Sequence, residues 1–368
     1  MYMALIQDIL NNIEAFAPPA LQESYDNAGL QCGNSKQEAT GALFCLDITE
    51  GVIKEAIEKK CNLIIAHHPL IFSPLKRLTG ANYVEQLIIT AIKHDIVLYA
   101  CHTNADNVLK GGVNNKMAQK LGLVNTKVLQ PKKGLLKKLV TFCPDKQADS
   151  VREALFNAGC GQIGNYDSCS FNTPGKGTFK GNDAANPFVG EKNKLHTEAE
   201  TRIETIFELY KEKQVIDALF KAHPYEEVAY DIYTLDNTHP QIGSGLVGEL
   251  PNPVDEKEFL QSLKSIFKAK GIRHTAFLHK KIKRVALCGG SGSFLLKDAI
   301  AAQADIFITG DFKYHQFFDA ENRLLIADIG HYETEQFTPE IFYEVVTKKI
   351  PTFAAYLSNL NTNPINYL

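Results

Sequence analysis

Two adjacent histidines, His67 and His68, follow the short apolar run Asn62–Ala66 and precede Pro69. An apolar run of this length is typical of a strand buried in a parallel sheet, and the proline ends the strand at the histidines. Ligands bind at the carboxyl ends of strands in open α/β sheets. A single buried histidine is more often a satisfied core residue, whereas an adjacent pair at a strand end indicates a metal site.

The next predicted strand ends in a similar way. The apolar stretch Asp95–Cys101 leads into His102 and, four residues later, Asp106. Right-handed crossovers place the carboxyl ends of successive parallel strands at one edge of the sheet, so these side chains should lie near His67 and His68. For His102 two roles stay open: a general acid or base beside the metal, or a hydrogen-bond partner that orients a ligand.

A third group of ligand types follows the last strong strand, Leu324–Ile329. A new helix begins there, and His331 and Glu335 stand four residues apart on it, so that they share one face. This spacing lets two side chains bind one ion, as in the helix-borne motifs of zinc hydrolases. His315, on the preceding helix, is a second candidate for a general acid or base, or for a residue that supports a ligand.

Three imidazoles and two carboxylates are more ligands than one tetrahedral zinc ion needs. The candidate metal ligands are His67, His68, Asp106, His331 and Glu335. They suit two divalent ions, with Asp106 and Glu335 free to bridge, and two such ions can clamp a hydroxide and stabilise charge that develops on an attacked centre. Zinc is the first expectation, and the mixed nitrogen and oxygen donors also suit iron, manganese or cobalt.

A glycine-rich stretch follows the predicted strand Arg284–Cys288 and contains Gly289, Gly290 and Gly292. A turn of this kind between a strand and a helix can present backbone N–H groups to an anion. The stretch lacks the Gly-Lys-Ser/Thr ending of a P-loop and the spacing of the dinucleotide fingerprint. An anion-binding site and a simple tight turn therefore both stay open.

Composition limits the class of protein. A chain of 368 residues should form two or three domains, and its 45% hydrophobic and 22% charged content is that of an ordinary globular protein. A net charge of −3 gives no reason to expect nucleic acid or an acidic membrane as a partner. Residues 1–16 have the apolar spacing of an amphipathic helix rather than a secretory signal, and no apolar run reaches about 20 residues. The eight cysteines form no C-x-x-C pair, so we expect a reduced, cytoplasmic protein.

The order of elements predicts an α/β protein with an insertion. Strands alternate with helices over residues 1–128 and 239–368, which favours a layered core with a mostly parallel sheet built from both ends of the chain. Residues 129–238 follow the order strand, helix, strand, strand, helix, strand, which is that of a ferredoxin-like α+β domain. Within this insert, Thr173–Gly177 reads as part of an irregular loop. His223–Glu227 is similar to CutA-like and PII-like domains.

Five separated motifs resemble one family. They are Tyr25-Asp26-Asn27-x-Gly29-Leu30, Ala66-His67-His68-Pro69, His102-Thr103-Asn104-x-Asp106, Gly310-Asp311 with His315, and Gly330-His331-x-x-x-Glu335. Together they resemble the dinuclear-metal family of GTP cyclohydrolase I type 2 homologues, also called NGG-interacting-factor-three-like proteins, in its long form with a CutA/PII-like insert. The resemblance extends to the tail Asn361–Ile365, and Tyr25 stands where many members have tryptophan.

The resemblance carries expectations about the site and the assembly. It implies that His67, His68, Asp106, His331 and Glu335 are the metal ligands, in a homohexameric ring whose metal sites face an inner cavity. It also implies ring opening of a nucleotide such as GTP by a metal-bound hydroxide, which makes the chain a metal-dependent hydrolase. The alternative is a non-enzymatic regulatory ring whose PII-like insert senses a ligand. A nuclease is the weakest reading, because no basic stripe with interleaved aromatics is evident.

Overall fold

The fold is that of a computed structural model, which describes residues 4–368. Residues 1–3 of the predicted first helix lie outside the described residues. The chain forms two compact units: a core unit, made of the residues up to Pro131 together with Gln241–Leu368, and an insert, Lys132–Pro240. From the sequence, the boundaries are expected after residues 128 and 238.

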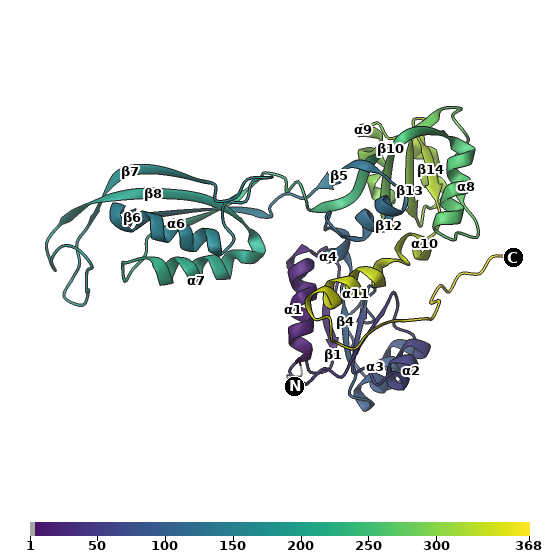
Figure 1. The fold of residues 1–368 in the computed structure, drawn as a ribbon, viewed down its shortest axis with the longest axis horizontal. Helices are drawn as coiled ribbons and strands as arrows, with labels where there is room; N and C mark the ends of the chain where they lie inside the picture. Colours follow the sequence, from purple (N-terminus) through teal and green to yellow (C-terminus); the bar gives the residue numbers. More distant parts are fainter. Residues whose placement is uncertain (1–3) are drawn as a thin grey trace. The chain divides into compact units, whose positions relative to one another are not determined.

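The first sheet of the core unit has the strand order β1-β4-β3-β2-β15, of which Figure 1 labels β1 and β4. Its strands are β1 (Gly29–Cys32), β2 (Ala42–Cys45), β3 (Leu63–Ala66), β4 (Val97–Ala100) and β15 (Ala355–Leu357). All pairs are parallel except the edge pair of β1 with β4. Every residue of β2, β3 and β4 is buried, because helices cover both faces. The helices are α1 (Ile6–Phe16) and α11 (Thr338–Lys349) on one face, and α2 (Glu50–Glu58) and α3 (Tyr83–Lys93) on the other.

The second sheet of the core unit has the order β11-β14-β13-β12-β10-β5. Its strands are β5 (Val124–Pro131), β10 (Gly243–Asp255), β11 (Arg273–His274), β12 (Lys281–Ser291), β13 (Ile306–Gly310) and β14 (Leu325–Asp328). The central strands β12, β13 and β14 are parallel, and the remaining pairs are antiparallel. Helices α5 (Val113–Lys120) and α8 (Glu256–Ile266) cover one face, and α9 (Leu296–Ala301) covers the other. The predicted α/β class and layered core are confirmed, with the core divided into two sheets.

The insert is a four-stranded antiparallel sheet with the order β7-β8-β6-β9. In chain order its elements are β6 (Leu136–Pro144), α6 (Ala148–Asn157), β7 (Ser170–Phe179), β8 (His196–Glu208), α7 (Glu212–Ala222) and β9 (Tyr230–Leu235). Both helices pack on one face of the sheet (Figure 1). This strand and helix order is the one that a ferredoxin-like unit has.

One expectation for the insert is wrong. Thr173–Gly177 is not an irregular loop but the middle of β7, where Thr173 pairs with Arg202 and Gly177 pairs with Glu198. The proline and glycines that suggest a loop are tolerated because β7 is an edge strand, where a missing N–H need not break a ladder. Across residues 4–368, no helix combines the length and the apolar character that crossing a membrane requires.

Candidate metal centre

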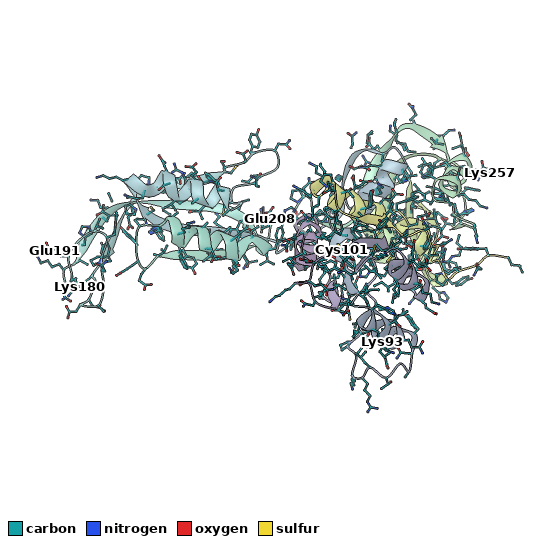
Figure 2. The ribbon with its side chains drawn as sticks, turned by 60° about the horizontal axis from the view of Figure 1, so that its bottom comes forward. Lys93, Cys101, Lys180, Glu191, Glu208 and Lys257 are labelled. Atoms are coloured by element: carbon teal, nitrogen blue, oxygen red, sulfur yellow. The ribbon has the colours of Figure 1, made fainter. Side chains whose placement is uncertain are left out.

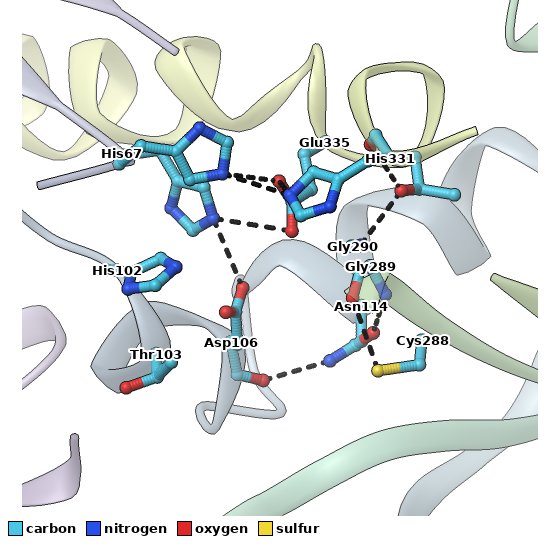
Figure 3. A network of polar contacts seen from close by, with 12 residues as sticks. His67, His102, Thr103, Asp106, Asn114, Cys288, Gly289, Gly290, His331 and Glu335 are labelled. Atoms are coloured by element: carbon cyan, nitrogen blue, oxygen red, sulfur yellow. Dashed lines mark hydrogen bonds and ion pairs between the residues drawn. The ribbon is translucent and has the colours of Figure 1, made fainter. Parts of the chain in front are cut away.

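The site residues of the core unit follow the ends of strands from both of its sheets. His67 and His68 come directly after β3, and Asp106 ends the short helix α4 (Thr103–Asp106) that follows β4. The second sheet contributes α10 (His331–Glu335), which begins three residues after β14. Figure 3 shows the labelled side chains of these segments pointing toward one another. Residues 267 positions apart in the chain thus come within hydrogen-bonding distance.

Two sets of donor atoms share the carboxylate of Glu335. In the first donor set (His68, His331 and Glu335), Glu335 Oε2 lies 2.9 Å from His68 Nε2 and 3.0 Å from His331 Nε2. In the second donor set (His67, Asp106 and Glu335), His67 Nε2 lies 3.6 Å from both Glu335 Oε1 and Asp106 Oδ1. Each oxygen of one carboxylate therefore belongs to a different set.

The second donor set contains two buried atoms without a partner. His67 Nε2 and Asp106 Oδ1 have no hydrogen-bond partner in the part of the chain that the structure describes. A buried polar atom left unpaired costs about 1–3 kcal/mol, so native structures seldom keep one without a reason. A cation between these atoms would satisfy both. The imidazole and carboxylate donors present therefore fit a bound divalent metal.

All four histidines of the cluster have their Nδ1 atoms engaged. The contacts are His67 Nδ1 with Cys101 O at 2.9 Å, His68 Nδ1 with Asp47 Oδ1, His102 Nδ1 with Asp26 Oδ1 and His331 Nδ1 with Asp311 Oδ2, each of the last three at 2.7 Å. This arrangement fixes each ring and leaves Nε2 for the cluster, as carboxylates and carbonyls do around metal-bound histidines. Three of the four partners are aspartates.

Sequence reasoning did not assign these aspartates. Asp26 and Asp311 lie inside motifs of the family resemblance but had no role there, and Asp47 was not singled out at all. Asp47 lies two residues beyond the end of β2, so the strand-end signal that selects His67 could also have selected it. Although burial raises the pKa of Asp26, hydrogen bonds from His102 and Thr103 bring it down to about 2.

The ionisable groups of the cluster shift one another's pKa values. Burial lowers the pKa of His68 and of His331, but the carboxylates of Glu335 and of the orienting aspartates outweigh burial and raise these values to about 10 and about 11. Burial alone would raise the pKa of Glu335, yet the surrounding imidazoles hold it well below its usual value. Burial and the nearby Glu335 raise the pKa of Asp106. The imidazoles and the shared carboxylate therefore stabilise each other's charged forms.

Of the two predicted acid–base histidines, the structure brings only one to the site. The rings of His67 and His102 are 5.2 Å apart, and His67, His68 and His102 form a third group of donor atoms. His315 lies instead in the 3₁₀ segment Tyr314–Ala320, where it is exposed and does not line the cavity at the metal centre. Its position after a strand and its place in the motif of Gly310-Asp311 with His315 had suggested a role at the site.

Of the predicted anion site at Gly289, Gly290 and Gly292, the first two N–H groups are already engaged. The N–H of Gly289 donates to Asn114 Oδ1, and the N–H of Gly290 donates to Thr334 Oγ1, both at 2.9 Å, so neither is free for an anion. The lack of a side chain at Gly290 and Gly292 instead leaves space for neighbouring side chains. A Cβ on Gly290 would lie 2.3 Å from Glu335 Oε1, and Gly290 also has φ of +60°. A Cβ on Gly292 would lie 2.5 Å from Thr309 Oγ1.

The cluster lies in a cavity of about 560 Å³. Its lining includes three exposed aromatic rings, those of Tyr25, Phe72 and Phe294. The C-terminal tail supplies another part of the wall through Asn363–Ile365. The tail also reaches the orienting residues, because Thr362 Oγ1 donates to Asp47 Oδ2 at 2.5 Å.

Comparison with known proteins shows which family the chain belongs to. The family model described as Duf34/NIF3 (NGG1p interacting factor 3) matches residues 4–364. The chain is 40% identical over 372 residues to the GTP cyclohydrolase 1 type 2 homolog of Bacillus subtilis, covering 98% of each chain, and 41% identical to that of Halalkalibacterium halodurans, covering 90% and 89%. The crystal structure of a Bacillus cereus protein related to NIF3 is 38% identical and superposes over the full length of both chains with a TM-score of 0.85. The chain belongs to the Duf34/NIF3 family.

Proposed function

We propose that this protein is a metal-dependent hydrolase with two divalent ions, one in each donor set. The observation that carries the proposal is the Glu335 carboxylate, which offers one oxygen to each set beside the unpaired atoms His67 Nε2 and Asp106 Oδ1. Zinc suits these donors best, and iron, manganese or cobalt also fits. When bound, two such ions activate water as a nucleophile and stabilise negative charge on the attacked group.

The chain's own residues supply positioning and a proton. Asp47 and Asp311 hold the His68 and His331 rings so that both Nε2 atoms face Glu335. Asp26 holds Nδ1 of His102 in the same way, which leaves Nε2 of His102 available beside the cluster. That nitrogen is placed to hold a proton and to give it to a departing group.

A nucleotide such as GTP is the proposed substrate class. The relatives in Bacillus subtilis and Halalkalibacterium halodurans carry the name GTP cyclohydrolase 1 type 2 homolog. The exposed rings of Tyr25, Phe72 and Phe294 in the cavity suit stacking against a purine base. In the proposed reaction water adds across the C=N bond of the guanine imidazole ring, with its oxygen going to the carbon and one hydrogen to that nitrogen. The bond from the carbon to the other ring nitrogen then breaks, and the second hydrogen goes to the departing nitrogen, which leaves a formamide.

Metal analysis and a product screen test the proposal. We expect two ions per chain, turnover of GTP that chelator abolishes, and loss of both in Glu335→Gln. Glu333→Gln is a matched control, because Glu333 lies on the same helix and is equally buried but accepts a hydrogen bond from Asn363. Two bound ions without turnover of nucleotides or phosphoesters would instead favour a regulatory, non-enzymatic role. One ion or none would contradict the two-ion site.

We also propose that the protein works in the cytoplasm as a homo-oligomer, in the hexameric ring that the family resemblance implies. All eight cysteines are free in the structure, which suits a reducing compartment. Light scattering after size-exclusion chromatography measures the assembly, and a monomer at micromolar concentration would contradict it.

A further inference from the structure

The insert contains a cavity of its own, of about 750 Å³. It lies on the sheet face away from α6 and α7, because Cys143 and Ile203 pack against those helices while their neighbours Phe142 and Arg202 line the cavity. The segment linking β7 to β8 forms another wall, and Figure 2 shows Lys180 and Glu191 of this segment at one end of the insert. The volume is that of a site for a small molecule.

Two glycines of β7 keep this cavity open. Gly175 and Gly177 pair with Glu200 and Glu198 of β8, so both occupy positions on the cavity face without adding a side chain. A Cβ on Gly177 would lie 2.0 Å from Glu200 Oε2. The absence of a side chain at Gly177 therefore admits the Glu200 carboxylate into the space.

Glu200 is an acidic group with one unused oxygen. Its exposed fraction is 8%, and its Oε1 accepts a hydrogen bond of 2.8 Å from the Tyr225 hydroxyl. No hydrogen bond to Oε2 is found within residues 4–368, and Oε2 is not one of the buried atoms left without a partner, so it is open to the cavity that Glu200 lines. A carboxylate can accept several hydrogen bonds, and one phenol hydroxyl leaves most of this capacity unused. The cavity thus presents an acceptor for a donor that carries positive charge.

Aromatic rings surround this acceptor. The ring centroid of Tyr225 lies 5.9 Å from that of Phe179 and 6.4 Å from that of Phe188, at interplanar angles of 60° and 53°. The segment that carries Phe188 is fastened to the opposite wall, because the N–H of Asn186 donates to Glu226 Oε1 at 2.6 Å. Aromatic rings that line one cavity together with a carboxylate are a combination that attracts a cation.

We propose that this cavity binds a small organic cation with an amine or guanidinium head group, which donates hydrogen bonds to Glu200 Oε2 and packs against Phe179, Phe188 and Tyr225. Three cationic residues line the cavity, namely Lys176, Lys180 and Arg202. Arg202 is engaged elsewhere, since its Nε lies 3.0 Å from Glu204 Oε1 and its guanidinium lies over the Phe142 ring. The site is independent of the metal centre and of the reaction proposed for it.

Calorimetric titration of the full-length protein tests this site with three probes. Agmatine and arginine carry a guanidinium, whereas citrulline has nearly the shape of arginine with a neutral urea in its place. We expect saturable binding of agmatine and arginine and none of citrulline at the same concentration. Glu200→Gln should weaken agmatine binding about tenfold or more, because a hydrogen bond to a charged group is lost. Glu153→Gln, an exposed position on α6 outside the cavity, should leave binding unchanged.

A second variant tests the site even if Glu200→Gln does not fold. Phe188 is 52% exposed, so Phe188→Ala should keep the fold and still weaken agmatine binding several-fold. His68→Ala should remove metal without changing agmatine binding, which separates this site from the metal centre. Absence of saturable binding at millimolar agmatine, equal binding of citrulline and arginine, or a Phe188→Ala variant that changes only the oligomeric state would overturn the proposal.

Discussion

The core unit and the insert each bury a glutamate, and the two glutamates are compensated differently. Glu335 lies among three imidazoles whose Nε2 atoms point at it, and each imidazole is held from behind by a backbone carbonyl or an aspartate. Glu200 has a single phenol hydroxyl and a wall of aromatic rings. The surroundings of Glu335 suit a metal ion, because imidazole nitrogens can donate electron pairs to it. The surroundings of Glu200 suit an organic cation, because aromatic ring faces attract a cation only electrostatically.

The largest expected effect is at the shared carboxylate. Glu335→Gln removes an oxygen donor from both sets, so we expect loss of both ions and a fall in turnover of more than about a hundredfold. Metal content per chain by mass spectrometry checks this, with agmatine binding as the control for the insert. Retention of two ions would show that Glu335 is not shared.

Asp47→Asn should have a smaller effect on the same centre. The amide still fills the space but no longer fixes the charge and tautomer of His68, which typically costs 10–100-fold in metal affinity. Competition with a chromophoric chelator measures the affinity of each ion separately. Because Asp47 supports only the first donor set, equal loss at both ions would contradict the division into two sets.

The stability of the insert should depend on pH through Glu208, in a way that the stability of the core unit does not. Burial raises the pKa of Glu208 in β8, but the hydrogen bond from His239 and the ion pair with Lys211 at 2.8 Å lower it to about 2. A lowered pKa stabilises the folded insert above the unfolded value near pH 4, and this stabilisation is lost as pH falls toward 2. Glu208→Gln should therefore destabilise the insert by about 2–3 kcal/mol at pH 7 and by little at pH 2.

Hydrogen exchange read by mass spectrometry follows the two units separately. Peptides from β8 should lose protection in the variant at pH 7, and peptides from β3 should not. A loss of the same size at pH 2 would mean that the charge of Glu208 is not responsible.

The smallest expected effect is at the tail. Thr362→Val removes the hydroxyl that donates to Asp47 Oδ2, and we expect metal affinity to fall only a few-fold, because Asp47 keeps its bond to His68. Thr362→Ser should restore it. If Thr362→Val and Thr362→Ser weaken metal binding equally, the tail acts through packing and not through the hydroxyl of Thr362.

Much of the cluster of histidines and carboxylates could be predicted because its signals are local. A buried strand that ends at His67 and His68 and a helix turn that carries His331 and Glu335 each need only a few neighbouring residues to be recognised. Asp47 escaped prediction although it also follows a strand, since a lone aspartate after a strand is common. His315 was predicted near the site because it follows a strand end along the chain. That position does not determine the direction of the short helical segment that carries it, and its side chain is exposed outside the cavity.

The sequence by itself determined which residue types stand at the strand ends, because burial and helix spacing are set by neighbours along the chain. Only the tertiary structure decided that Glu335 gives one oxygen to each donor set and that the glycines of β12 make room for it instead of binding an anion. It also decided that β7 is a strand and that Glu200 faces a cavity. These features depend on contacts between segments far apart in the chain, whose distances and directions follow from packing and not from spacing.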